Sequence, residues 1–405
     1  MDSPFANKTF QTLLLCWMVA GTAMWMNDVS AAWIMSSLST DPLMIALVQT
    51  ASTLPVFFLG LPFGALADML DRRRMFILTQ IWGAVIAVLF AISFFFDLIG
   101  PWLILALVLC NGAGLAMRGP VFSALVPNIV KREQLRSALA MNSLATNGSR
   151  VLGPLCAGLL IAAAGPGWVF VCNGVLCAIT SVMLLRWSFR QPPRTEPVEP
   201  IVRAMAEGLR FLWHSVAMRM ILLRTVLVFS QAIIIIAMLP LVARALPGAG
   251  AGTYGVMFAF MGLGAVTGAM FIARLTGVLG AENTLRIGRF SHAMATLTVA
   301  LAPNLWVALP GMYLAGMSWM VSGNTMTVAA QLHLPDRLRA RGMSVYQTAL
   351  IGGGAIGAAY WGQIASLTSV RTAMLLSVVV ALILLALTHR FNLPPEPDSS
   401  HDATM

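Results

Sequence analysis

Charged residues are scarce in this chain. Asp, Glu, Lys and Arg make up 10% of its 405 residues, whereas about a quarter of the residues in a soluble domain are charged. Hydrophobic residues account for 59% of the chain. The composition excludes the polar surface of a soluble globular protein and predicts an integral membrane protein.

Cysteine and histidine are also scarce, with five residues of each. All five cysteines lie inside long apolar runs, where a thiol is most often a small buried side chain, and their spacing indicates neither a disulfide framework nor a metal site. No cluster of His, Cys and carboxylate residues indicates a hydrolytic centre. We therefore expect no metal, no cofactor and no enzymatic activity.

What the chain has in place of charge is a series of twelve apolar runs of about 20 residues, the length that crosses a bilayer. Their continuous apolar character predicts helices, because the strands of a membrane barrel alternate apolar and polar residues. The expected fold class is an all-α membrane protein with twelve transmembrane helices. The predicted spans cover residues 10–37, 42–66, 75–96, 101–125, 139–164, 167–187, 219–243, 252–275, 286–302, 305–330, 343–366 and 370–389.

Basic residues gather in alternate breaks between the spans, and only Arg244 and Arg371 fall on the other side. Since Lys and Arg near span ends stay in the cytoplasm, we expect both termini to be cytoplasmic and the protein to lie in a bacterial inner membrane. The excess of 25 basic over 15 acidic residues is explained by this bias, so it does not indicate binding to nucleic acid.

The longest break between spans opens with RQPPRTEPVEP and divides six spans from six. Apolar residues then recur at helical spacing, which predicts an amphipathic helix on the inner leaflet. The predicted organisation is a six-helix half at 1–187, a cytoplasmic linker at 188–218, a second six-helix half at 219–390 and a polar cytoplasmic tail at 391–405.

The two predicted halves repeat one another faintly. Asn142 precedes Gly148 by the same interval as Gln347 precedes Gly353, each after a proline and a basic loop. Internal repetition at this period is expected of transporters whose halves rock about a midplane site.

The stretch GALADMLDRRRM, residues 64–75, concentrates charge between two apolar runs. It resembles the signature loop of the major facilitator superfamily, G-x-x-x-D-[RK]-x-G-[RK]-[RK], although Met69 and Asp71 depart from the pattern. The matching residues are Gly64, Asp68, Arg72 and Arg73. The resemblance implies the twelve-helix fold of that superfamily and a role for Asp68 at a cytoplasmic gate. The alternative is an ordinary helix-end charge followed by retention signals.

A second stretch, RVLGPLCAGLL at 150–160, is similar to the antiporter motif G-P-x-x-[GA]-G of the same superfamily. The residues concerned are Arg150, Gly153, Pro154, Ala157 and Gly158. The motif is found mainly in exporters, so it implies efflux, with plain helix packing as the alternative. Residues 31–68 and 238–270 resemble the branch that includes the enterobactin exporter, the transmembrane secretion effector family, which implies export of a small molecule.

Asp28 is the only acidic residue well inside a predicted span, and Trp25 shares its helical face. Because burial of an ionisable group in a membrane is costly, such residues are candidate functional sites. A carboxylate in a partly dry cavity binds protons more readily, so we expect Asp28 to exchange a proton for substrate. The alternative is a structural Asp paired with a polar neighbour.

Further candidates follow from the resemblance, because spans 1, 4, 7 and 10 line the cavity in that superfamily. Arg118 is expected to face a substrate anion or Asp28, and Arg150 to tie spans 5 and 4 near the cytoplasmic gate; snorkelling of both to the headgroups is the alternative. The remaining candidates for the cavity wall, each also compatible with helix packing, are Asn27, Gln231, Trp319, Asn324, Tyr346 and Gln347.

Together these features predict a monomeric secondary active transporter that exports a small amphipathic molecule, siderophore-like or drug-like, by proton-coupled antiport and alternating access. Its expected partners are the substrate, protons and the lipid bilayer. An importer, a lipid flippase on the same fold, or a non-transporting scaffold or sensor remain as alternatives.

Overall fold

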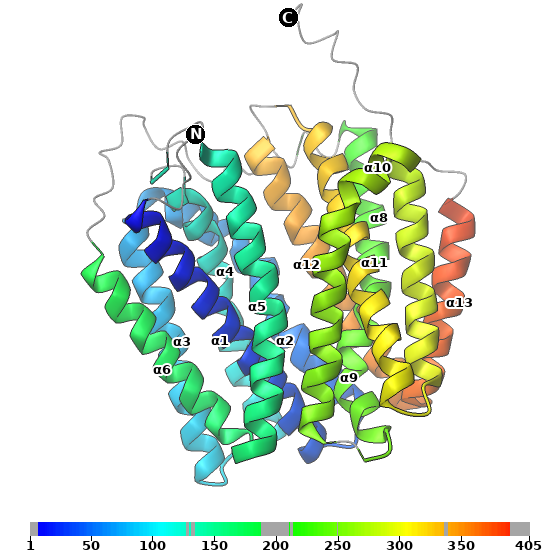
Figure 1. Cartoon of the computed structure of the whole chain (residues 1–405), viewed down its shortest axis with the longest axis horizontal. Helices are drawn as coiled ribbons and strands as arrows, with labels where there is room; N and C mark the ends of the chain where they lie inside the picture. The colour runs from blue at the N-terminus through cyan, green and yellow to red at the C-terminus, as the bar shows by residue number, and fades with distance from the viewer. Residues whose placement is uncertain are drawn as a thin grey trace, which may run out of the picture.

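The computed structural model describes residues 7–126, 129–130, 134–187, 210, 214–248, 250–335 and 339–388. All regular elements in this part of the chain are helices (Figure 1). The all-helical class predicted from the apolar runs is therefore confirmed.

The first group of helices closely follows the predicted spans. It comprises α1 (Lys8–Leu38), α2 (Pro42–Met69), α3 (Arg72–Phe95), α4 (Pro101–Leu125), α5 (Leu135–Ala164) and α6 (Gly167–Arg186). Helices α1, α2 and α3 are capped at their N-termini by the side chains of Asn7, Asp41 and Asp71. These side chains accept hydrogen bonds from free backbone N–H groups of the first turn. Proline occupies the start of α2 and α4, where its missing N–H has no cost.

The second group departs from the predicted spans in two places. It comprises α8 (Val216–Ala232), α9 (Ile234–Ala245), α10 (Ala251–Leu301), α11 (Leu305–Leu332), α12 (Arg339–Leu367) and α13 (Val370–Thr388). The predicted span 219–243 is broken at Ile233 between α8 and α9. The predicted spans 252–275 and 286–302 both belong to α10, which doubles back at Gly280 (Figure 1).

Gly280 makes this reversal possible because its backbone adopts φ 77° and ψ 163°, a region that only glycine enters readily. The prediction of a ten-residue break at 276–285 is wrong: the flanking residues are helical on both sides of this glycine. A single residue thus separates the two arms of α10.

Ten helices in the described part are long and apolar enough to cross a membrane, counting α8 with α9 as one and α10 as one. The protein is therefore a multi-pass membrane protein. Helix α12 is not among the ten, since polar residues and the run Gly352–Gly354 dilute its apolar character.

The bundle has two ends, which we call the terminal side, where α1 begins and α13 ends, and the far side opposite to it (Figure 1). On the far side one buried apolar cluster joins both groups of helices, with Met26 and Val29 from α1 packed together with Leu239 and Tyr254 from α9 and α10. The two groups thus share a core at this end.

On the terminal side the described side chains form two separate cores. One contains Phe10, Phe76 and Phe122 from the first group, and the other contains Met218 and Tyr346 from the second group. The described contacts between the groups are therefore concentrated at the far side.

Most of the predicted linker helix and the whole predicted tail at 391–405 lie outside the described residues. At the end of the linker, Ser215 accepts a hydrogen bond from the backbone N–H of Met218 and so caps α8. The predicted boundaries of the two halves remain predictions.

Candidate functional site

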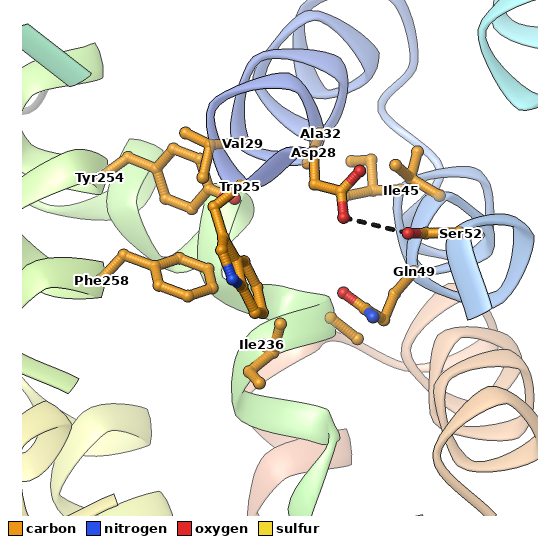
Figure 2. A pocket seen from close by; sticks show the side chains of 12 residues that line it. Trp25, Asp28, Val29, Ala32, Ile45, Gln49, Ser52, Ile236, Tyr254 and Phe258 are labelled. Atoms are coloured by element: carbon orange, nitrogen blue, oxygen red, sulfur yellow. Dashed lines mark hydrogen bonds between the residues drawn. The ribbon is translucent and has the colours of Figure 1, made fainter. Parts of the chain in front are cut away.

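A cavity lies where the two groups of helices meet, between α1, α2, α9 and α10 (Figure 2). We call it the Asp28 cavity. Its wall includes Trp25 and Asp28 of α1, Gln49 and Ser52 of α2, Ile236 of α9, and Tyr254 and Phe258 of α10. Of the predicted cavity residues, Trp25 and Asp28 line it.

Asp28 has one satisfied and one unsatisfied carboxylate oxygen. The Ser52 hydroxyl donates to Oδ2 at 3.0 Å (Figure 2), whereas Oδ1 is buried and has no hydrogen-bond partner among the described residues. A buried carboxylate without a counter-charge is costly unless it binds a proton or a ligand donor. The geometry therefore suits Asp28 to either role.

Aromatic rings from both groups of helices form one wall of the cavity. The Trp25 and Phe258 ring centroids lie 5.9 Å apart, and Tyr254 lies 6.1 Å from Phe258. Trp33 stacks on Tyr254 at 5.8 Å, further toward the far side. These rings offer an apolar surface next to a single carboxylate.

The glycines of the predicted antiporter motif pack α5 against both groups. A Cβ added at Gly153 would clash with the Trp25 side chain. A Cβ added at Gly158 would lie 2.7 Å from Gly255 Cα, and the Pro154 carbonyl faces the same glycine. The close approach of α5 to α1 and α10 therefore depends on these small residues, beside the Asp28 cavity.

Arg150 lies against the same tryptophan. Its Cζ is 5.7 Å from the Trp25 ring centroid, and its Nε is buried without a hydrogen-bond partner among the described residues. The membrane-facing side of α5 is marked by Leu152 and Leu159, which are 42% and 60% exposed, and Arg150 lies on the opposite side of the helix. The described contact of Arg150 is thus with α1, where sequence analysis had expected a tie to span 4.

Arg118 lies in the interior of the first group. Its guanidinium donates to the Ala20 carbonyl at 2.8 Å and lies 5.3 Å from the Trp17 ring centroid. It borders a second cavity, which is lined by α1, α3, α4 and α6. The ion pairs recorded in the described part of the chain do not include one between Arg118 and Asp28.

The other predicted cavity residues are dispersed. Asn27 is fully buried and accepts a hydrogen bond from Asn173 of α6 at 3.2 Å. Gln231 and Trp319 border a third cavity inside the second group, together with His292. The structure therefore does not gather these three residues around Asp28.

Three further candidates lie outside the Asp28 cavity. The Tyr346 hydroxyl is 3.1 Å from Thr327 Oγ1 within the terminal-side core of the second group. Gln347 is exposed on α12 and Asn324 is half-buried on α11. Tyr346 therefore has a packing role in this structure.

The predicted gate motif is described only in part. Gly64 and Asp68 belong to α2, but their side chains lie outside the described part of the structure. Asp71 caps α3 by accepting from the Arg74 backbone N–H at 3.0 Å. Arg73, two residues into α3, donates to the carbonyls of Leu184 at 3.0 Å and Leu185 at 2.7 Å. Arg72 is half-buried at the first residue of α3.

The polar residues of α2 and the aromatic residues of α10 in the Asp28 cavity were not predicted from the sequence. Gln49 and Ser52 are three residues apart in an apolar span, so a search for polar pairs on one helical face would have found them. Tyr254 and Phe258 carry no comparable signal, because an aromatic pair at this spacing is common in packed helices.

Comparisons with known proteins support the fold. A family model described as transmembrane secretion effector matches residues 2–404. The chain is 26% identical over 355 residues to the enterobactin exporter EntS of Escherichia coli (strain K12), covering 85% of this chain and 84% of that protein. It is 25% identical over 354 residues to the MFS-type transporter YfiS of Bacillus subtilis (strain 168), covering 84% and 80%.

The crystal structure of the nucleoside transporter NupG superposes with a TM-score of 0.79 at 12% identity, covering 95% of this chain and 98% of that one. At this identity the likeness concerns the fold alone.

Proposed function

Because the chain belongs to the transmembrane secretion effector family of major facilitator transporters, we propose that this membrane transporter exports a small amphipathic molecule in exchange for protons. The relatives named above include an enterobactin exporter, which favours a siderophore-like substrate. A drug-like molecule of similar amphipathic character fits the same wall of aromatic rings.

One observation carries this proposal: a single carboxylate, Asp28, has a free oxygen in a cavity formed by both groups of helices. A group at such a junction can bind a proton or a substrate donor, but the two compete for the same oxygen. Antiport requires this competition, because the protein must bind the proton in one half of its cycle and the substrate in the other.

The proposed cycle is alternating access between the terminal side, which we assign to the cytoplasm with both chain ends, and the far side. In this structure the two groups of helices share a core only at the far side among the described residues, as expected of a state open to the cytoplasm. Protonation of Asp28 from outside favours this state, and substrate binding favours the return. The segment around Asp68, at the end of α2, then closes the cytoplasmic side.

In the same proposal the chain is a monomer of twelve spans in two halves of six, in a bacterial inner membrane. The two arms of α10 count as separate spans because α10 doubles back at Gly280, and α12 supplies the remaining one. The tie between Arg73 and the end of α6 anchors the start of the third span beside the sixth.

The test compares small molecules in spent medium from cells that carry the native chain or the Asp28→Asn variant at equal membrane abundance, with iron-limited growth included. We expect a compound that is present outside native cells to be retained inside the variant cells. Asp97→Asn is a matched control, because Asp97 is exposed in the loop before α4. Identical profiles for the native chain and Asp28→Asn would contradict the proposal, and depletion of a compound from the medium by native cells would indicate import.

A further inference from the structure

Two opposite charges lie near the Trp25 ring, and neither takes part in an ion pair recorded among the described residues. Asp28 lies on one side, with its Oδ1 buried and unpartnered, and Arg150 lies on the other, with its Nε buried and unpartnered. We propose that the transported molecule is a zwitterion whose amine binds Asp28 and whose acidic group binds Arg150, with its apolar body against Trp25. This inference rests on the proposed function and specifies its substrate class.

The positions of the two charges follow from how α1 and α5 pack. Three contacts fix how the two helices are aligned. Trp17 Nε1 donates a hydrogen bond to Thr146 Oγ1. A Cβ added at Gly21 would contact the Ser149 side chain, and a Cβ added at Gly153 would contact the Trp25 side chain. The two helices therefore run parallel and in step, with Gly153 level with Trp25.

At a rise of about 1.5 Å per residue, Asp28 lies about 4.5 Å beyond Trp25 toward the far side. Arg150 precedes Gly153 by three residues, so it lies about 4.5 Å on the terminal side of the same ring. The backbone positions of the two charged residues are thus separated by about 9 Å along the bundle axis. A small molecule that carries one aromatic ring between an amine and an acid has its two ends at a separation of this order.

The lack of partners argues for a ligand at both positions. An ionised group held away from water without a counter-charge is strongly unfavourable. The Trp25 ring contact of Arg150 at 5.7 Å compensates only part of that cost, and the Ser52 hydroxyl satisfies only one oxygen of Asp28. The Nε of Arg118 is also buried without a partner among the described residues, but its guanidinium donates to the Ala20 carbonyl and lies over the Trp17 ring.

The surroundings of Trp25 suit the middle of such a molecule. Its ring lies 5.9 Å from Phe258, and the Asp28 cavity continues past it to Gln49 and Tyr254 (Figure 2). A ligand amine at Asp28 would occupy the oxygen that a proton needs, so substrate and proton exclude one another there. The acidic group of the ligand adds affinity by its contact with Arg150. Because the net charge of the ligand is zero, this contact does not disturb the exchange of proton and substrate at Asp28.

The test uses the full purified chain in lipid nanodiscs and three probes that share one ring and chain length: para-(aminomethyl)phenylpropionic acid, its methyl ester, and para-methylphenylpropionic acid. The first is a zwitterion, the second has only the amine and the third only the acid. We expect the native protein to bind the zwitterion about tenfold or more tighter than either analogue, since each lost charge leaves a buried partner unpaired.

The variants separate the two contacts. Arg150→Gln should weaken binding of the zwitterion about tenfold and leave the ester unchanged, and Asp28→Asn should weaken binding of the zwitterion and leave the acid-only probe unchanged. Arg150→Lys retains the charge and should retain the preference for the acid. Arg219→Gln and Asp97→Asn, both at exposed positions, are the controls.

Equal affinities for the three probes would overturn the proposal. So would an Arg150→Gln variant that weakens all three probes alike, because Arg150 would then act on Asp28 or on packing. Export of molecules that lack either charge overturns this inference alone. Charge-selective binding without any export in the spent-medium test supports the zwitterion site and overturns the proposed function alone.

Discussion

The far side and the terminal side of the bundle differ in how the two groups of helices meet. At the far side one buried cluster contains residues of both groups, Gly158 and Gly255 bring two backbones together, and Arg244 lies over Trp33. At the terminal side each group has its own core among the described side chains. The contacts that join the two groups at the far side are therefore distinct from those that stabilise each group, and they can be altered separately.

The difference also explains the place of the Asp28 cavity. It lies next to the shared cluster, with Trp25 and Phe258 from the two groups in contact across it. A molecule that separates or joins these rings acts directly on the boundary between the groups. The Asp28 cavity and the contacts that join the two groups of helices therefore lie side by side in the bundle.

The largest effect is expected from the terminal-side core of the second group. Glu282 accepts both Arg224 hydrogen bonds, at 2.9 and 3.0 Å, and Arg224 is buried. Glu282→Gln leaves this arginine without its counter-charge, at an expected cost of about 3 kcal/mol. Hydrogen exchange should accelerate in α8 and α10 and remain unchanged in α1–α6. Arg219→Gln on the exposed side of α8 is the control, and faster exchange in the first group would contradict separate cores.

The next effect tests closure of the far side. Gly158→Leu forces α5 away from Gly255, and overpacking of this kind costs about 1–3 kcal/mol. The expected result is an opened far side, with about tenfold or faster labelling of a cysteine placed at Ile236, in a cysteine-free background, by an impermeant maleimide. Gly148→Leu is the matched control on α5, since no neighbour lies within 4 Å of an added Cβ there. Equal labelling of the two variants would show that the Gly158 contact does not close this side.

A smaller effect is expected from the Arg244 contact at the far side. Its guanidinium lies 4.1 Å from the Trp33 ring centroid and donates to Ser36 Oγ at 2.7 Å, which joins α9 to α1. Arg244→Gln should weaken closure by about 1 kcal/mol, seen as about fivefold faster labelling at Ile236. Arg371→Gln removes the other far-side arginine, which is exposed, and should have no effect.

The smallest effect concerns the first group alone. Arg73→Ala removes two hydrogen bonds from the end of α6, and we expect about 1–2 kcal/mol lower stability, with faster exchange at the end of α6 and unchanged labelling at Ile236. Arg74→Ala is the control, because the Arg74 side chain is 88% exposed. Faster labelling with Arg73→Ala would indicate that the terminal-side contacts also control the far side.

Much of the fold was predictable from local signals. The start of α4 agrees with the prediction because Pro101 follows Gly100, and α6 agrees because Gly165 and Pro166 separate it from α5. The break at Ile233 was missed because it falls within a run of four isoleucines that carries no turn signal. The reversal at Gly280 was placed in a longer loop because charged residues surround it.

The candidate site was predictable where one residue carried the signal. Asp28 was found because acidic residues are rare in the spans, and the structure brings Trp25 beside it. The sequence could not show which cavity Arg118 and Arg150 face, because a few tens of degrees of helix rotation decide the direction of a side chain. Tyr254 and Phe258 reach Asp28 only through contacts between the two groups of helices, which no local pattern records.

Proton movement in proteoliposomes tests whether Asp28 exchanges a proton for substrate. The compound retained by Asp28→Asn cells is supplied on one side of vesicles that contain the native chain, and the internal pH is followed as the compound crosses. We expect proton flux opposite to the compound, and loss of that flux with Asp28→Asn but not with Asp97→Asn. Transport of the compound without proton movement, or unchanged proton flux in Asp28→Asn, would contradict it.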